Sequence, residues 1–143
     1  MLERMTYSVE ETEQFGRMLA GRLRPGDLLV LSGDLGAGKT ALVRGLAAGL
    51  GLEDEVSSPT FVIMNEYRGR GPVRLCHFDF YRLRDEDDLY STGYYDLLDT
   101  DAILAVEWGE RIPEALPKAA IWVRMKRVDA QTRRITVEGD ERF

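Results

Sequence analysis

The 143 residues, 44% hydrophobic and 31% charged, are typical of one globular domain spanning residues 1–143, and no apolar run approaches the roughly 18 residues of a transmembrane helix. The 25 acidic and 19 basic residues give a net charge of −6, which argues against a protein whose main task is to grip nucleic acid by its phosphates. One cysteine, Cys76, excludes an intrachain disulfide, and an acidic N-terminal segment leaves no signal-peptide core, so we expect a cytoplasmic protein.

The first fifty residues predict two helices on either side of a buried strand. Ser8 and Glu11 have the spacing of a capping box, and apolar residues then recur every four positions. This helix is expected to end before residues 24–26, Arg-Pro-Gly. The apolar run at residues 28–31 indicates a buried strand, and residues 40–50 indicate a helix with one apolar face.

Between this strand and helix stands the octet Gly33-Asp34-Leu35-Gly36-Ala37-Gly38-Lys39-Thr40, which fits the pattern G-x-x-x-x-G-K-[ST]. In such a loop the backbone N–H groups from Asp34 to Thr40 point at phosphate oxygens, Lys39 reaches the outer phosphates, and the Thr40 hydroxyl binds Mg²⁺. The helix N-terminus adds partial positive charge. We therefore predict a nucleoside triphosphate site; the alternative is a glycine turn that merely begins a helix.

The rest of the chain predicts a mixed sheet. Strand-like segments at residues 61–67 and 73–80 are separated by five residues, too few for a crossover helix, so they should pair antiparallel. The acidic stretch at residues 85–101 predicts short helices and turns. Further strands are expected at residues 102–106, 119–125 and 133–137. The predicted fold class is α/β: a single P-loop NTPase domain with a mixed central sheet flanked by helices.

Two carboxylates that follow predicted strands are candidates to complete a metal site with Thr40. Asp79 ends the segment Leu-Cys-His-Phe-Asp, and Glu107 follows Ile-Leu-Ala-Val. Mg²⁺ in P-loop proteins commonly takes a second ligand from a strand-end carboxylate. Either acid could bind the metal directly or through water, or could orient and deprotonate an attacking water. The alternative for each is a surface or capping acid.

Four further features stay open between a functional and a structural reading. Residues 58–60, Ser-Pro-Thr, lie where P-loop switches often keep a γ-phosphate sensor, or they form a proline turn. His77, the only histidine, stands within a predicted strand, which favours a hydrogen-bonded structural residue over a base. Trp108 covers the nucleotide, anchors a partner or packs in the core. The basic residues within 124–134 favour a solvated hairpin face over RNA or partner contact.

ATP is a better candidate nucleotide than GTP, because the guanine-recognition pattern Asn-Lys-x-Asp and the γ-phosphate pattern Asp-x-x-Gly are missing. Asn65 is followed by Glu66, and Asp79 leads to Arg82. A small-molecule kinase needs an acceptor pocket and usually an arginine-bearing lid, for which 143 residues leave little room. ATP hydrolysis coupled to a conformational signal fits this chain better.

Four segments together resemble one protein family. They are the octet above, Ser58-Pro59-Thr60-Phe61, His77-Phe78-Asp79-Phe80-Tyr81-Arg82 and Glu107-Trp108. In this order they resemble the TsaE (YjeE) family, small bacterial ATPases required to make threonylcarbamoyladenosine in tRNA. The resemblance covers nearly the whole chain, and no motif position departs from it.

The resemblance implies a Mg²⁺-dependent ATPase that works with TsaD, which transfers the threonylcarbamoyl group, and with TsaB, the paired subunit of TsaD. It implies contact with tRNA only indirectly and no role at a membrane. ATP binding and slow hydrolysis would reset the assembly between turnovers. Thr40 and Glu107 would be the Mg²⁺ ligands, Asp79 the catalytic or water-organising group, and residues 58–61 a switch. A small-molecule kinase and a non-enzymatic nucleotide-sensing scaffold remain the alternatives.

Overall fold

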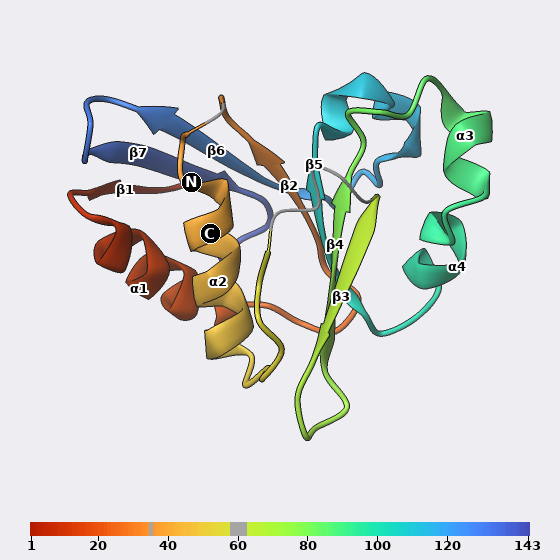
Figure 1. Ribbon diagram of the computed structural model, residues 1–143, viewed down its shortest axis with the longest axis horizontal. Helices are drawn as coiled ribbons and strands as arrows, with labels where there is room; N and C mark the ends of the chain where they lie inside the picture. The colour runs from red at the N-terminus through yellow and green to blue at the C-terminus, as the bar shows by residue number, and fades with distance from the viewer. Residues whose placement is uncertain (35, 58–62) are drawn as a thin grey trace.

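A seven-stranded mixed sheet runs through the molecule (Figure 1), which is described by a computed structural model over residues 1–34, 36–57 and 63–143. The strands lie in the order β1-β7-β6-β2-β5-β4-β3. Four central strands are parallel, whereas β3, β7 and β1 pair antiparallel at the two edges. The strands are β1 (Leu2–Thr6), β2 (Leu28–Ser32), β3 (Met64–Arg68), β4 (Arg74–Asp79), β5 (Ile103–Glu107), β6 (Ile121–Arg127) and β7 (Arg133–Glu138). The predicted α/β class with a mixed sheet is confirmed.

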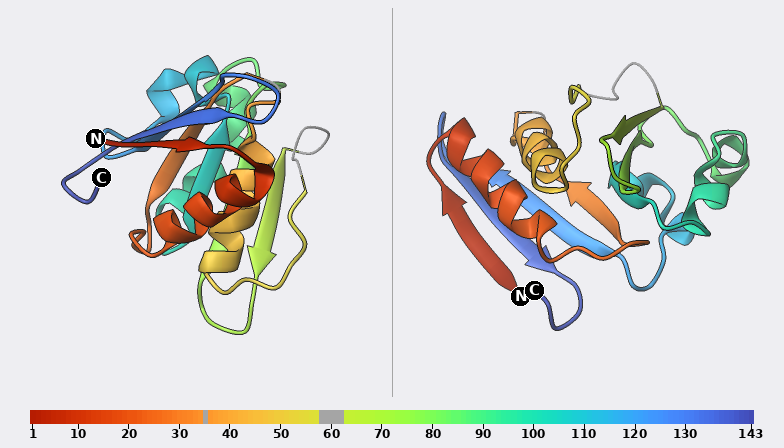
Figure 2. Two further views of the ribbon diagram at one scale, coloured as in Figure 1. Left: turned by 90° about the vertical axis from the view of Figure 1, so that its left-hand side faces the viewer. Right: turned by 90° about the horizontal axis from the view of Figure 1, so that it is seen from below.

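Helices cover both faces of this sheet (Figure 2). Helices α1 (Val9–Ala20) and α2 (Lys39–Gly49) lie side by side on one face. The other face packs against short elements: α3 (Glu86–Tyr90), α4 (Tyr94–Leu98) and the 3₁₀ turns η1 (Gly109–Arg111) and η2 (Pro113–Ala115). Within the described residues, no helix combines the length and the apolar character needed to cross a bilayer.

The N-terminus of α1 forms as the sequence predicts, with one difference. The Ser8 hydroxyl accepts a hydrogen bond from the Glu11 N–H at 3.1 Å. The Glu11 carboxylate accepts from the Tyr7 N–H, also at 3.1 Å, and thus caps the residue before Ser8. The helix ends at Ala20, before the Arg-Pro-Gly segment that was expected to stop it. One of the otherwise unpaired donors of the helix, the Glu11 N–H, and the N–H of Tyr7 just before the helix are therefore satisfied locally.

Strand β2 is buried on both faces, and its alternating side chains enter two separate cores. Leu29 and Leu31 pack with the α1 and α2 side chains, while Leu28 and Val30 pack with those of α3, α4 and η2. This explains why β2 is a continuous apolar run without polar alternation. Packing on both faces holds β2 in place, and the end of β2 sets where the following loop begins.

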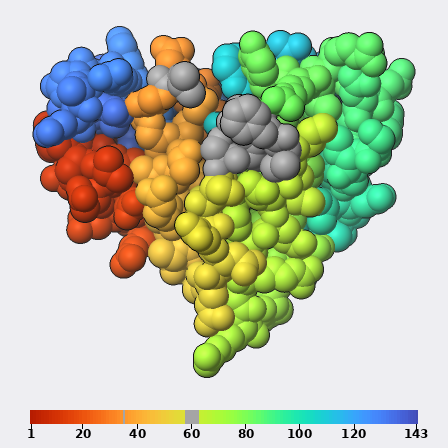
Figure 3. Space-filling model, in the orientation of Figure 1, coloured from red at the N-terminus to blue at the C-terminus, as the bar shows by residue number. Residues whose placement is uncertain are grey.

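Sequence reasoning missed β1 and placed several boundaries one to three residues away. Residues 28–31 were expected to form the first strand, but β1 already pairs with β7 from Leu2 to Thr6. Only Thr6 in β1 is fully buried, so its sequence lacks a clear hydrophobic alternation, and its place depends on the edge of β7. Strand β3 begins at Met64, while residues 58–62 lie outside the described part. The antiparallel β3–β4 hairpin is confirmed, and it forms the tapered lower end of the molecule in Figure 3.

Candidate nucleotide and metal site

The glycine-rich loop joins β2 to α2, as its motif requires. Gly38 precedes the helix with φ +96°, a left-handed conformation that side chains disfavour, and no side chain among the described residues caps the helix. The first N–H groups of α2 are therefore open to an external acceptor such as phosphate. A Cβ on Gly33 would lie 2.6 Å from the Met125 carbonyl oxygen, so only glycine fits there. Leu35, a loop residue that was also predicted to bind phosphate, lies outside the described residues.

Lys39, the first residue of α2, is held by groups of the chain itself. Its Nζ donates to the Gly33 carbonyl at 2.7 Å and lies 3.4 Å from Glu107 Oε1. The same ammonium lies 5.6 Å from the centre of the Trp108 ring. Only 11% of the Lys39 side chain is exposed. The motif lysine is thus in place at the loop, with partners that a phosphate group could replace.

The two candidate carboxylates meet at one edge of the sheet. Asp79 ends β4 and Glu107 ends β5, and the two residues are direct register partners on these parallel strands. Both are only 7% exposed. The Tyr81 N–H donates to Asp79 Oδ1 at 2.8 Å, which orients that carboxylate. Burial raises the pKa of Asp79 above its ordinary value, an effect that the Tyr81 hydrogen bond only partly offsets. Neither residue is a surface acid.

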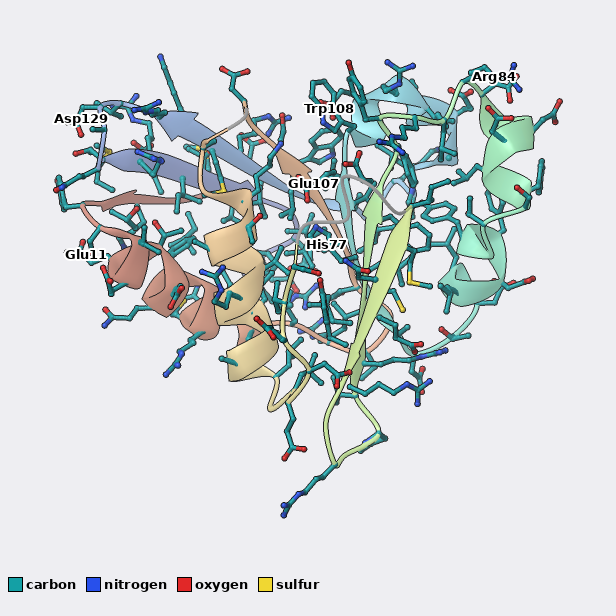
Figure 4. The ribbon with its side chains drawn as sticks, viewed as in Figure 1. Glu11, His77, Arg84, Glu107, Trp108 and Asp129 are labelled. Atoms are coloured by element: carbon teal, nitrogen blue, oxygen red, sulfur yellow. The ribbon has the colours of Figure 1, made fainter. Side chains whose placement is uncertain are left out.

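His77 and Glu107 point toward each other at the centre of the molecule (Figure 4). His77 Nε2 lies 2.6 Å from Glu107 Oε2, and the ring is fully buried. Burial alone would raise the pKa of Glu107, but His77 and Lys39 outweigh it and hold that pKa below its usual range. The carboxylate is therefore ionised near neutral pH. His77 is hydrogen-bonded, as expected, but sequence reasoning did not indicate that its partner is a predicted metal ligand.

Trp108 lies beside Lys39 and is not a core residue. It is 37% exposed, and its ring packs on the ring of Tyr81 at 5.1 Å between centroids. Its φ of +59° is the only positive value among the non-glycine residues that the structure describes. Such a backbone conformation costs about 1–3 kcal/mol and persists where the surroundings require it. Of the three roles considered for Trp108, core packing is therefore wrong.

The donor groups fit Mg²⁺ bound together with a phosphate. In the described ranges, no three His, Cys, Asp or Glu side chains form a ready cluster of metal ligands. Mg²⁺ does not need such a cluster, because it keeps several waters and binds one or two carboxylates together with substrate phosphates. Thr40 follows Lys39 in the first turn of α2, and Glu107 and Asp79 supply oxygen atoms at the neighbouring strand ends. These residues suit Mg²⁺ better than zinc, which prefers nitrogen and sulfur ligands.

A hollow of about 250 Å³ adjoins the loop, and sequence reasoning did not find it. Its walls come from the start of α1, the start of α2 and the β6–β7 turn, and include Glu10, Gly38, Ala41, Gln131 and Arg133. These segments are far apart in the chain, so no local motif could have revealed the cavity. One of the predicted basic residues, Arg133, thus lines a cavity beside the loop and is not merely part of a solvated face.

The sequence profile of one protein family, described as "Threonylcarbamoyl adenosine biosynthesis protein TsaE", matches residues 6–135. This chain belongs to the TsaE family. It is 36% identical over 133 residues to a protein of Treponema pallidum named tRNA threonylcarbamoyladenosine biosynthesis protein TsaE, covering 93% of this chain and 97% of that protein. It is 40% identical over 131 residues to the protein of the same name from Bacillus subtilis, covering 92% and 81%. The crystal structure of YdiB from B. subtilis superimposes with a TM-score of 0.81 at 34% identity, covering 96% and 84%.

The TsaE match includes every described residue of the site, from Gly33 to Glu107. The resemblance stated from the four sequence segments is confirmed at the level of the family. The predicted switch, residues 58–61, lies inside the matched range but outside the described residues.

Proposed function

We propose that this TsaE-family protein is a Mg²⁺-dependent ATPase and an accessory subunit of the machinery that forms threonylcarbamoyladenosine in tRNA. The observation that supports the ATPase most directly is the position of Lys39. It stands at the start of an uncapped helix after a buried parallel strand, within reach of both the loop carbonyl and Glu107. This is the arrangement in which a loop of this type binds the β- and γ-phosphates.

The residues divide the work on the nucleotide. The N–H groups of Gly36 to Thr40 bind phosphate oxygens, and Lys39 exchanges its contacts with the Gly33 carbonyl and with Glu107 for a contact with a phosphate. Thr40 and Glu107 hold Mg²⁺, which when bound neutralises charge on the phosphates. Asp79 orients the attacking water and accepts its proton, because a carboxylate with a raised pKa is a better base than one in water.

The purine fits the hollow beside Gly38 and Ala41. The cavity of about 250 Å³ opens at the helix start that receives the phosphates, so one nucleotide can occupy both sites. Arg133 and Gln131, at the β6–β7 turn, are polar residues that line its wall. The nucleoside end of ATP, for which the sequence indicated no residues, would thus lie in this cavity.

The family name supports a role in tRNA modification, and the charge of the chain supports an indirect one. With a net charge of −6 it is suited to bind a basic tRNA-processing partner and to oppose bound tRNA. We propose that the partners are TsaD and TsaB, and that ATP binding and slow hydrolysis reset their assembly between turnovers. The transfer of the threonylcarbamoyl group takes place on TsaD.

The test is phosphate release from ATP by this chain alone and with TsaB and TsaD, each with and without tRNA. The proposal predicts slow Mg²⁺-dependent release by the chain alone and a change in rate with the partners. Tight ATP binding without release under every condition would support a nucleotide-sensing scaffold instead. Transfer of the γ-phosphate to an added metabolite, with little free phosphate, would support a small-molecule kinase.

A further inference from the structure

His77 is a buried polar residue whose position packing alone does not explain. Its side chain has no exposed surface, yet one ring nitrogen, Nδ1, has no hydrogen-bond partner among the described residues. Buried polar groups are nearly always paired, because an unpaired one loses its hydration without compensation. An apolar side chain would fill the same space without that cost. The other nitrogen, Nε2, makes one short contact, and that contact is with Glu107.

The strands hold this contact in a fixed geometry. His77 lies on β4 opposite Ala105 of β5, two residues before Glu107 on the same face of that strand. The small side chain of Ala105 leaves room for the ring to reach along β5. On its other side the ring is packed at a tilt against Tyr67 of β3, with 6.4 Å between centroids. Because both neighbours belong to the sheet, the ring has little freedom to turn away.

The contact gives the two oxygen atoms of Glu107 different partners. A carboxylate only accepts hydrogen bonds, so the nitrogen that faces it, Nε2, carries the proton and donates to Oε2. The other oxygen, Oε1, faces Lys39 Nζ at 3.4 Å. When Lys39 binds a phosphate, Oε1 loses that partner while Oε2 keeps its own. One oxygen atom is then left, in a fixed orientation, on the side of the phosphate loop.

We propose that His77 is a positioning residue that holds Glu107 by Oε2 so that Oε1 is presented to the Mg²⁺ of the bound nucleotide. The inference rests on the proposed function, since it concerns the metal of that same site. Hydrogen-bond partners of metal ligands typically account for 10- to 100-fold in metal affinity. The same effect is expected here, with no effect on the metal-free binding of nucleotide, because His77 is not part of the phosphate loop.

Two amide substitutions distinguish the effect of the Nε2–H donor from the effect of losing the imidazole ring. In His77→Gln the side-chain amide nitrogen can take the position of Nε2 and still donate to Glu107. In His77→Asn it takes the position of Nδ1, which has no partner among the described residues. Both are measured for Mn²⁺ affinity in the ADP complex by electron paramagnetic resonance, and for ADP affinity in EDTA by calorimetry. Thermal unfolding confirms that each variant is folded.

We expect His77→Asn to weaken Mn²⁺ binding 10- to 100-fold and His77→Gln to stay within about threefold of the unchanged protein. ADP affinity in EDTA should be the same for all three proteins. Unchanged Mn²⁺ affinity in folded His77→Asn would overturn the inference, and so would equal losses in both variants. Failure of the unchanged protein to bind ADP at all would instead contradict the proposed function.

If His77→Asn does not fold, the unchanged protein still provides a test. It has one histidine, so imidazole nitrogen signals in NMR spectra need no assignment. Adding Mg²⁺ to the ADP complex should shift the Nε2–H signal, because the metal withdraws electron density from the carboxylate that accepts this proton. An Nε2–H signal that does not move at saturating Mg²⁺ would overturn the inference.

Discussion

Two clusters of charged side chains lie at opposite ends of the parallel strands β2 and β5, and they differ in how completely they are paired. The terminal clamp, formed by Asp27, Asp140 and Arg142, lies at the start of β2. Arg142 donates to Asp27 at 2.8 and 3.2 Å and to Asp140 at 2.9 Å. The nucleotide site, formed by Lys39, His77, Asp79 and Glu107, lies at the other end.

The charged groups of the clamp are hydrogen-bonded to one another and to the backbone, whereas those of the site have partners that a ligand could replace. In the clamp Arg142 also donates to the Arg22 carbonyl, and the Arg24 N–H donates to Asp27. It joins the end of the chain to the segment before β2, next to the contact between the N-terminal amine and the Phe143 carbonyl. In the site the ion pair between Lys39 and Glu107 is longer, at 3.4 Å, and burial raises the pKa of Asp79. The comparison indicates that the clamp serves stability and that the site gives up stability for binding.

Replacing the motif lysine should give the largest effect. Lys39→Ala removes the only charge that reaches from α2 to both the loop and Glu107, and we expect ATP turnover to fall by roughly 10³-fold without loss of folding. Steady-state phosphate release measures this. Lys118→Ala is the matched control, since Lys118 is exposed and far from the motif in the chain. Turnover within twofold of the unchanged protein for Lys39→Ala would contradict the role of the loop.

Asp79 should matter for the chemical step more than for binding. Asp79→Asn keeps the acceptor for the Tyr81 N–H but cannot take a proton, so we expect turnover to fall about 10²-fold at unchanged ADP affinity. Calorimetry and phosphate release separate the two quantities. Asp87→Asn, at an exposed acid of α3, should change neither. If turnover persists in Asp79→Asn, Asp79 is not the base.

A substitution in the clamp should lower the stability of the fold and leave nucleotide binding unchanged. Arg142→Ala leaves Asp27, which is largely buried, without its main partner, and we expect a loss of roughly 1–3 kcal/mol in the free energy of unfolding. Nucleotide affinity should not change, because the clamp and the site lie at opposite ends of the strands. Urea unfolding and calorimetry test both statements. Arg70→Ala, in an exposed ion pair, should cost little.

The smallest effect should be on the pH dependence of stability, where the ionised acids of the two clusters contribute with opposite signs to the free energy of unfolding. Hydrogen bonds from Arg142 lower the pKa of Asp140 to about 2. Ionised Asp140 therefore stabilises the fold near neutral pH, and this stabilisation is lost as the pH falls toward 2. Burial raises the pKa of Asp79, so ionised Asp79 destabilises the fold. This destabilisation develops as the pH rises from about 3.9, the pKa in unfolded chains, through the higher pKa of the folded state.

Asp79→Asn should therefore stabilise the fold at pH 7 and leave it unchanged below about pH 4. Asp140→Asn should destabilise it at pH 7 and have little effect near pH 2. Unfolding curves over this pH range measure both. Equal signs for the two variants at pH 7 would contradict the comparison between clamp and site.

The sequence predicted those parts of the site that are local in the chain. The loop from Gly33 to Thr40 has a fixed spacing, and the strand before it is a continuous apolar run, so both were found. Asp79 and Glu107 were each recognised as strand-end acids. That they are register partners could not be predicted, because the neighbours of β4 and β5 are set by the topology of the sheet and not by a local pattern.

The parts that were missed depend on long-range packing. Strand β1 has one fully buried residue and is held by the edge of β7. The clamp joins Asp27 to Arg142 across 115 residues, and the hollow beside the loop is lined from three distant segments. The hydrogen bond between His77 and Glu107 spans 30 residues and two strands. No periodicity or motif in the sequence predicts such contacts.

The N-terminus of α2, with Lys39 and Glu107, is expected to bind a nucleotide together with Mg²⁺. Titration calorimetry of ADP into the folded protein, with Mg²⁺ and then with EDTA, tests it most directly. We predict one site per chain, weaker binding in EDTA, and loss of binding in Lys39→Ala. Absence of binding heat at several temperatures, with protein shown to be folded by its thermal unfolding, would show that this site does not bind nucleotide.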